Sequence, residues 1–130
     1  MDWFPAHDVQ KVLTKIVFHL DFQHVKTDRI ICFRSFGSKT RAQARIWSLP
    51  RVWQLALSIP SAYVIEVIAE RFDKLSEEEQ KKVIIHELLH IPKNFSGALL
   101  PHRGRGEGIT HRRIERLFKV YQESLKEFKK

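Results

Sequence analysis

The sequence has little of what extracellular and membrane-spanning proteins need. Its 130 residues include one cysteine, Cys32, so no disulfide can form within the chain. No apolar run is long enough to cross a bilayer, and the first residues lack the basic and apolar succession of a secretory signal. We therefore expect a cytoplasmic protein without a membrane partner, in which Cys32 is an inert core residue.

Internal repeats and low-complexity linkers are also missing from the sequence. With 43% hydrophobic and 29% charged residues, the composition is that of a globular chain. A chain of 130 residues can bury one core but has no room for a second, regulatory domain. We expect a single domain over residues 1–130, with any functional site built inside it.

Hydrophobic spacing predicts a small sheet packed by helices. Apolar residues at helical spacing between Val9 and Leu20 predict a helix that begins near Asp8 and covers one face of the sheet. Pro50 can open a short helix. The expected strands are Arg29–Phe36, Arg45–Trp47 and Tyr63–Ile68.

Two helices are expected after the strands. The first begins after Ser76, which forms a capping box with Glu79, and ends near Ile91 because Pro92 disfavours helical geometry before it. The second follows Gly108, with Thr110 as its cap, and carries an apolar stripe for the core. The resulting fold class is α+β, a minimal domain with a mixed sheet, an N-terminal helix, a motif-bearing helix and a C-terminal helix.

The first of these two helices contains the run His86-Glu87-Leu-Leu-His90, an H-E-x-x-H motif. On a helix, this spacing places two imidazoles one turn apart on one face, where both can bind one zinc ion. Glu87 then flanks the metal and can reach a water molecule without serving as a ligand. Because apolar residues surround the motif, unpartnered His and Glu side chains would be costly there, and a metal would relieve that cost.

A third ligand is expected from the loop after Pro92. A catalytic zinc site typically has three protein ligands and one open position, and His102 lies in this loop behind the turn-forming Gly97 and the stiffening Pro101. His111 is the competing candidate, nine residues further on. The predicted ligands are therefore His86, His90 and His102, with Glu87 as the catalytic residue.

The stretch from Ser76 to His102 resembles the zincin metallopeptidases, most closely the small single-domain metallopeptidases of archaeal and phage type. The resemblance rests on the HELLHIP run, then Phe95-Ser96-Gly97, and finally Pro101-His102. It implies that the three histidines bind zinc and that Glu87 is the general base. The metzincin pattern after the second histidine is absent, and a small zinc-dependent ribonuclease family is a weaker match because its motif has Gly in place of Glu87.

The resemblance also implies a peptide or protein substrate that pairs with an edge strand beside the motif helix. Either the strand Tyr63–Ile68 or its neighbour can be that strand. Arg103, His111 and Tyr63 are candidates for stabilising the oxyanion, and Glu107 is a candidate for orienting a ligand imidazole. No spacing argument chooses among them.

The excess of positive charge indicates a second possible class of function. The chain has 23 lysines and arginines against 15 acids, a formal net charge of +8, and would be drawn to anionic partners. The alternative is therefore a nucleic-acid-associated protein, either a metal-dependent nuclease or a protease acting on nucleic-acid-bound proteins. A structural zinc site ranks last, since such sites favour four ligands and cysteine. The basic and aromatic residues in question are Arg34, Lys39, Arg41, Arg45 and Arg51 with Phe33, Phe36, Trp47 and Trp53, and then Arg103, Arg105, Arg112, Arg113 and Arg116.

Overall fold

A computed structural model describes residues 1–104 and 106–129, so Arg105 of the second basic cluster lies outside the described residues. The chain forms four strands, five α-helices and one short 3-10 turn within these ranges. In chain order they are β1 (Asp2–Pro5), α1 (His7–His19), η1 (Thr27–Arg29), β2 (Ile30–Phe36), β3 (Ala44–Ser48), α2 (Arg51–Leu57), β4 (Tyr63–Ile68), α3 (Ala69–Phe72), α4 (Glu77–Leu88) and α5 (His111–Phe128).

The strands make one mixed sheet in the order β1-β2-β4-β3. The central pair, β2 and β4, is parallel, with Ile30 opposite Tyr63. β1 is antiparallel to β2 at one edge, and β3 is antiparallel to β4 at the other, with Ile46 opposite Ile65. β4 therefore has a neighbour on each side, while β3 keeps one free edge.

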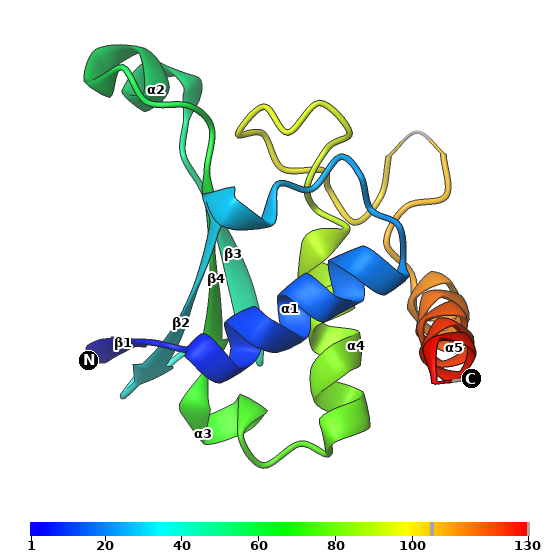
Figure 1. The fold of residues 1–130 in the computed structure, drawn as a ribbon. Coiled ribbons are helices and arrows are strands. Elements are labelled where there is room, and N and C mark those ends of the chain that lie inside the picture. The colour runs from blue at the N-terminus through cyan, green and yellow to red at the C-terminus, as the bar shows by residue number, and fades with distance from the viewer. Residues whose placement is uncertain (105, 130) are drawn as a thin grey trace.

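The helices α1 and α4 lie on one side of the sheet, and α5 packs against both of them (Figure 1). Alternate strand residues such as Cys32, Ile65 and Val67 point to this side and meet apolar residues of the helices, among them Leu13 and Ile85. The core thus fills the space between the sheet and α1 and α4. None of the helices in the described part of the chain is long and apolar enough to span a bilayer.

The expected α+β architecture is confirmed, and most elements lie where the sequence placed them. The strand Tyr63–Ile68 has the predicted bounds, and the short helix after Pro50 is present as α2. β1 and α3 were missed because each has four residues, too few for a periodic pattern. Cys32 is buried, and this burial raises the pKa of its thiol to about 12, as suits an inert core residue.

α4 begins as predicted and ends earlier than predicted. The Ser76 hydroxyl accepts from the Glu79 amide at 3.1 Å. The second half of the expected capping box is missing from the described hydrogen bonds, because the Glu79 carboxylate lies near Lys82 instead. The α-helix ends at Leu88, and His90 lies in the tighter turn that follows. The His90 amide donates to the Glu87 carbonyl at 3.1 Å.

A fully buried carboxylate links β4 to the edge strand β3. Glu66 in β4 is 0% exposed and accepts from Arg45 Nε at 2.6 Å and from Trp47 Nε1 at 2.9 Å, both on β3. Burial opposes ionisation of Glu66, but these donors outweigh it, so its pKa lies below the usual value of 4.5. The interaction ties β3, the edge strand beside α4, to the centre of the sheet.

Replacing this carboxylate should destabilise the fold. We expect Glu66→Ala to lower the free energy of unfolding at neutral pH by about 2 kcal/mol, because two partly exposed donors lose their buried, charged acceptor. The folded pKa of Glu66 is depressed, so its contribution is present above the ordinary carboxyl pKa and disappears as the pH falls through the folded value. Urea denaturation should therefore show a gap between wild type and variant that narrows below pH 4.5.

Asp8→Ala is the matched control, since Asp8 forms an exposed ion pair with Arg34. It should cost less than about 1 kcal/mol. Equal losses in the two variants would contradict the role given to Glu66.

Candidate metal centre

Three imidazoles converge at the end of α4. His86 comes from the last turn of the helix, His90 from the turn that follows it, and His102 from the loop before α5. The Nε2 atoms of His86 and His102 are 3.0 Å apart, and one ring nitrogen from each of the three histidines lies within 4.8 Å of the others. The ring centroids are 4.7 to 5.3 Å apart. The structure thus brings together the three histidines that the sequence singled out.

His90 and Leu100 hold the loop against the helix end through two hydrogen bonds. The Leu100 amide donates to the His90 carbonyl at 2.7 Å, and His90 Nδ1 lies 2.6 Å from the Leu100 carbonyl. Because a carbonyl oxygen only accepts, Nδ1 must carry the proton, which leaves the lone pair on Nε2. This backbone carbonyl therefore fixes the tautomer of His90 and leaves Nε2 as the nitrogen available to a metal.

The loop before Leu100 is fixed to the sheet by Tyr63. The Tyr63 hydroxyl donates to the Ala98 carbonyl at 2.8 Å and accepts from the Gly97 amide at 2.9 Å. Gly97 has φ +94°, and a Cβ there would lie 2.3 Å from Gln54 Nε2, so no other residue fits without displacing its neighbours. The path of the loop toward His102 therefore follows from close packing at Gly97.

Backbone contacts also fix His102 itself. Its carbonyl accepts from the Ile109 amide at 2.9 Å. A Cβ on Gly108 would lie 2.8 Å from the same oxygen, and Gly108 has φ +74°. His102 is exposed to solvent, so its position comes from these backbone contacts rather than from side-chain burial.

The local environment keeps the imidazoles of His86, which is half-buried, and His90, which is nearly buried, neutral. Burial, together with the nearby His90 and His102 rings, lowers the pKa of His86 to about 4. Burial also lowers the pKa of His90, and the nearby His102 ring adds to this effect. A metal binds the neutral imidazole, so at neutral pH these two side chains are in the form that binds a metal.

Glu87 sits beside this cluster in an apolar environment. It is 7% exposed, and its carboxylate makes no hydrogen bond or ion pair with any described residue. Burial raises its pKa to about 7. Glu87 and His86 line the same two hollows, so the carboxylate lies next to the imidazoles without being one of the clustered groups.

A groove of about 520 Å³ runs between β3 and the three histidines. β3 contributes Ala44, Arg45 and Ile46 to its wall, and the loop contributes residues 99–102. β3 is an edge of the sheet, whereas β4 is paired on both sides. Of the two strands that the sequence left open as the site of substrate pairing, β3 is therefore the one with a free edge.

The other residues that the sequence suggested for the site make different contacts in the structure. His111 is 88% exposed and lies 3.6 Å from Glu115, outside the histidine cluster. The Tyr63 hydroxyl is committed to the loop backbone. Glu107 pairs with Arg116 at 2.6 Å, so the suggestion that it orients a ligand imidazole lacks support, and the Leu100 carbonyl contacts His90 instead. A backbone group carries no residue-type signal, so no sequence pattern could have indicated this contact.

The cluster fits a metal ion. Two nitrogens bound to one tetrahedral zinc, each at about 2.0–2.1 Å, lie roughly 3.3–3.4 Å apart. The observed separations of 3.0 Å and of no more than 4.8 Å bracket this value. Neutral imidazoles are also ligands that zinc, copper, iron and nickel accept, in contrast to the oxygen ligands of magnesium and calcium. His86, His90 and His102 therefore form a group that could hold such an ion.

Comparison with known families defines the class of protein. A family model described as "Putative phage metallopeptidase" matches residues 1–128. The chain belongs to this family, whose name indicates a metal-dependent hydrolase of peptide or protein substrates. No curated protein and no solved structure matches the chain.

Removing one hydroxyl should loosen the loop that leads to His102. We expect Tyr63→Phe to destabilise the protein by about 1–2 kcal/mol, since it deprives the Gly97 amide of its acceptor. Hydrogen exchange of the Gly97 amide, followed by NMR, should become at least about tenfold faster. Tyr121→Phe is the control, because the Tyr121 hydroxyl makes no hydrogen bond within the described residues. Unchanged exchange in Tyr63→Phe would contradict the anchoring role.

Proposed function

We propose that the protein is a zinc peptidase in which His86, His90 and His102 bind the metal and Glu87 is the general base. The observation that carries the proposal is the convergence of three imidazoles, one of them fixed in its tautomer by the Leu100 carbonyl, beside a buried carboxylate that pairs with none of the described residues. Membership of a metallopeptidase family supports it.

Zinc suits this ligand set best among the common ions. Among the described residues the group has three imidazoles and no fourth ligand, which corresponds to an open catalytic site rather than to a closed structural one. When bound, zinc would supply a water of lowered pKa and a positive charge that polarises the scissile carbonyl. The three histidines hold the ion, and the neutral state of His86 and His90 lets them bind it at neutral pH.

Glu87 handles the proton in this proposal. Its carboxylate accepts a proton from the attacking water and then donates it to the leaving amine. The apolar environment that raises its pKa to about 7 brings its proton affinity close to what both transfers require at neutral pH. Within the described residues the same environment offers the carboxylate no competing partner.

The groove along β3 suits an extended peptide. A substrate strand that pairs with the free edge of β3 would pass the three histidines, since both line the same groove. Main-chain hydrogen bonds would then align the peptide, whatever its side chains. Glu66, which accepts hydrogen bonds from Arg45 and Trp47, would keep β3 paired with β4 while the substrate occupies its free edge.

Metal analysis tests the ligand set. Purified wild-type protein should carry about one zinc per chain, and His86→Ala, His90→Ala and His102→Ala should each lose most of it, because three ligands are the minimum for such a site. His111→Ala should retain the metal, since His111 lies outside the cluster. Retention of full zinc by any of the first three variants would remove that residue from the ligand set.

Substitution of Glu87 tests catalysis separately from metal binding. Glu87→Gln should keep its zinc and lose roughly 10²- to 10⁴-fold in kcat for peptide hydrolysis, because an amide cannot accept the proton. The rate is measured with a fluorogenic peptide library on metal-loaded protein. Undiminished cleavage by Glu87→Gln would eliminate Glu87 as the base.

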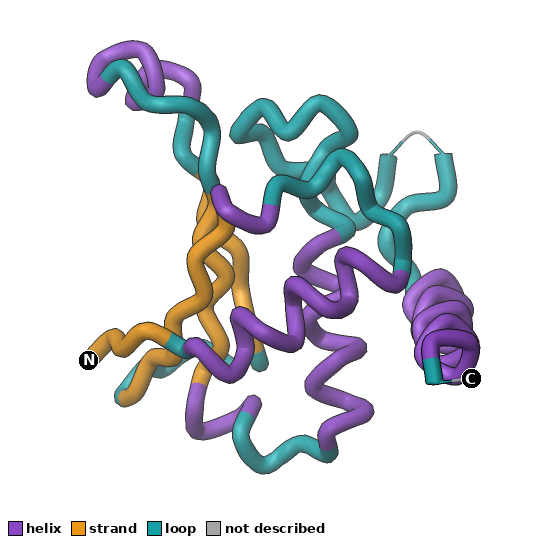
Figure 2. Tube along the Cα trace, in the orientation of Figure 1, coloured by secondary structure: helices purple, strands orange, loops and turns teal. Residues whose placement is uncertain are grey.

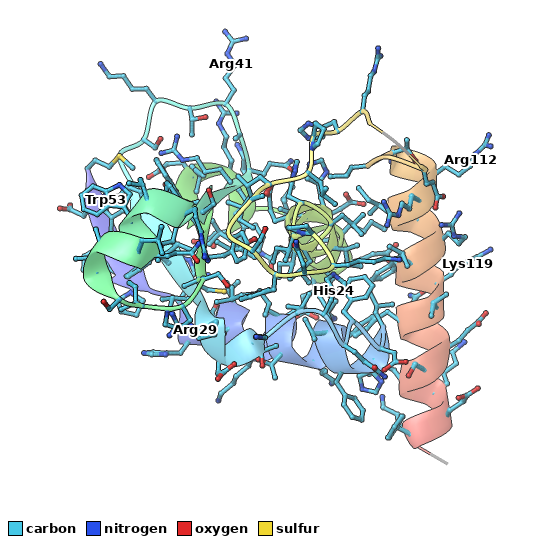
Figure 3. All side chains as sticks on the ribbon, turned by 90° about the horizontal axis from the view of Figure 1, so that it is seen from above. His24, Arg29, Arg41, Trp53, Arg112 and Lys119 are labelled. Carbon is cyan, nitrogen blue, oxygen red and sulfur yellow. The ribbon has the colours of Figure 1, made fainter. Side chains whose placement is uncertain are left out.

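Association with nucleic acid stays a prediction that the structure leaves open. Several of the arginines that motivated it are paired with acids of the same chain. Arg34 binds Asp8 and Asp73, Arg45 binds Glu66, and Arg116 binds Glu107. Arg41 and Arg112 do project into solvent (Figure 3). The internal pairing reduces the charge available for phosphate contacts, so peptide hydrolysis remains the favoured function.

A further inference from the structure

The helix α2 inverts the usual arrangement of a surface helix. Its one buried side chain is polar, Gln54, which is 6% exposed and donates to the carbonyls of Leu49 and Ser96. Its apolar side chains are exposed, with Val52 at 68%, Leu55 at 65% and Trp53 at 55%. Surface helices normally bury the apolar face and expose the polar one, so the exposed side chains of α2 call for a partner.

The apolar side chains surround most of the helix. At about 100° per residue, Val52, Trp53, Leu55 and Leu57 point in directions spread over the circumference, apart from the side taken by Gln54. α2 lies beyond one end of the sheet (Figure 1), where Gln54 joins it to the loop at Ser96 and its other side chains, Trp53 among them, are exposed. In the tube view, loops join it to the end of the sheet on both sides (Figure 2). A flat protein surface would cover one side of such a helix, whereas a fluid apolar medium can cover every side except the one at which Gln54 contacts the protein.

Positive charges accompany this apolar surface. Lys26 and Arg51 line a hollow together with Leu55 and Ile59. The Arg29 guanidinium contacts the segment that follows α2 and donates to the Pro60 carbonyl there at 2.8 Å. Residues 49–62 contain no acid, and the nearby turn η1 adds a single one, Asp28.

We propose that α2 docks the protein on an anionic lipid surface, with its apolar side chains in the membrane interface and the adjacent cations at the lipid headgroups. Short apolar elements with aromatic and basic neighbours bind at the boundary between the lipid headgroups and the acyl chains without crossing the bilayer. The expectation of no membrane partner rested on the lack of a spanning segment, which surface docking does not need.

Charge and side-chain chemistry select this occupant. A second copy of the chain would bring Lys26, Arg29 and Arg51 toward a molecule whose own net charge is +8, which disfavours it. Nucleic acid matches the charge, but the aliphatic side chains of Val52, Leu55 and Leu57 offer neither hydrogen bonds nor stacking planes to bases. An anionic bilayer satisfies both the cations and the aliphatic groups. The assignment does not depend on the metal centre or on peptidase activity.

Vesicle co-sedimentation of the full chain tests the assignment. The protein should bind phosphatidylcholine vesicles that contain phosphatidylglycerol and should bind pure phosphatidylcholine vesicles far more weakly. Trp53→Ser and Leu55→Ser should each lower the partition coefficient about tenfold, because each removes one inserted apolar group. Arg51→Ala should lower it about fivefold, the effect expected of one cation near an anionic surface.

The control is Phe128→Ser, which removes an equally exposed apolar group, at 67%, from the end of α5 and should leave binding unchanged. All four side chains are exposed, so the variants should keep the wild-type melting temperature, and circular dichroism checks this. Failure of the wild type to sediment with anionic vesicles would overturn the proposal, as would equal losses for Leu55→Ser and Phe128→Ser. A wild-type dimer that Leu55→Ser converts to monomers would assign the surface to a second copy instead.

Discussion

The site depends on the pair of hydrogen bonds between His90 and Leu100. One joins the two backbones, and in the other the Leu100 carbonyl accepts a hydrogen bond from Nδ1 of the imidazole. Together they bring a distant loop against the end of α4 and leave Nε2 of His90 available to a metal. The packing at Gly97 and Gly108 then carries the same loop on to His102, whose Nε2 lies 3.0 Å from that of His86.

The sequence predicted the elements that have a long periodic pattern or a strong boundary signal. Thr110 caps α5 as expected, and β4 has the expected bounds. It could not predict β1, whose four residues have no repeat, or the Leu100 carbonyl, which looks the same in every residue type. The sequence favours His102 over His111 only because of its position in the loop. The packing at Gly97 and Gly108 places His102 in the cluster, and it depends on tertiary contacts that residue spacing does not reveal.

The edge strand β3 connects the two functional surfaces. Its Ala44–Ile46 segment lines the groove of the three histidines, and only two residues separate its end at Ser48 from α2. Gln54 of α2 also donates to Ser96 in the loop that leads to His102. The proposed membrane element is therefore hydrogen-bonded to the loop that carries His102, and a docked α2 would hold the groove close to peptides at a lipid surface.

X-ray diffraction at the zinc absorption edge, from crystals of the wild-type protein, would locate the metal and its ligands. We expect one anomalous peak at about 2.0–2.1 Å from Nε2 of each of His86, His90 and His102, with the Leu100 carbonyl still on Nδ1 of His90. A peak elsewhere on the chain, or one bound by fewer than these three rings, would contradict the proposed ligand set.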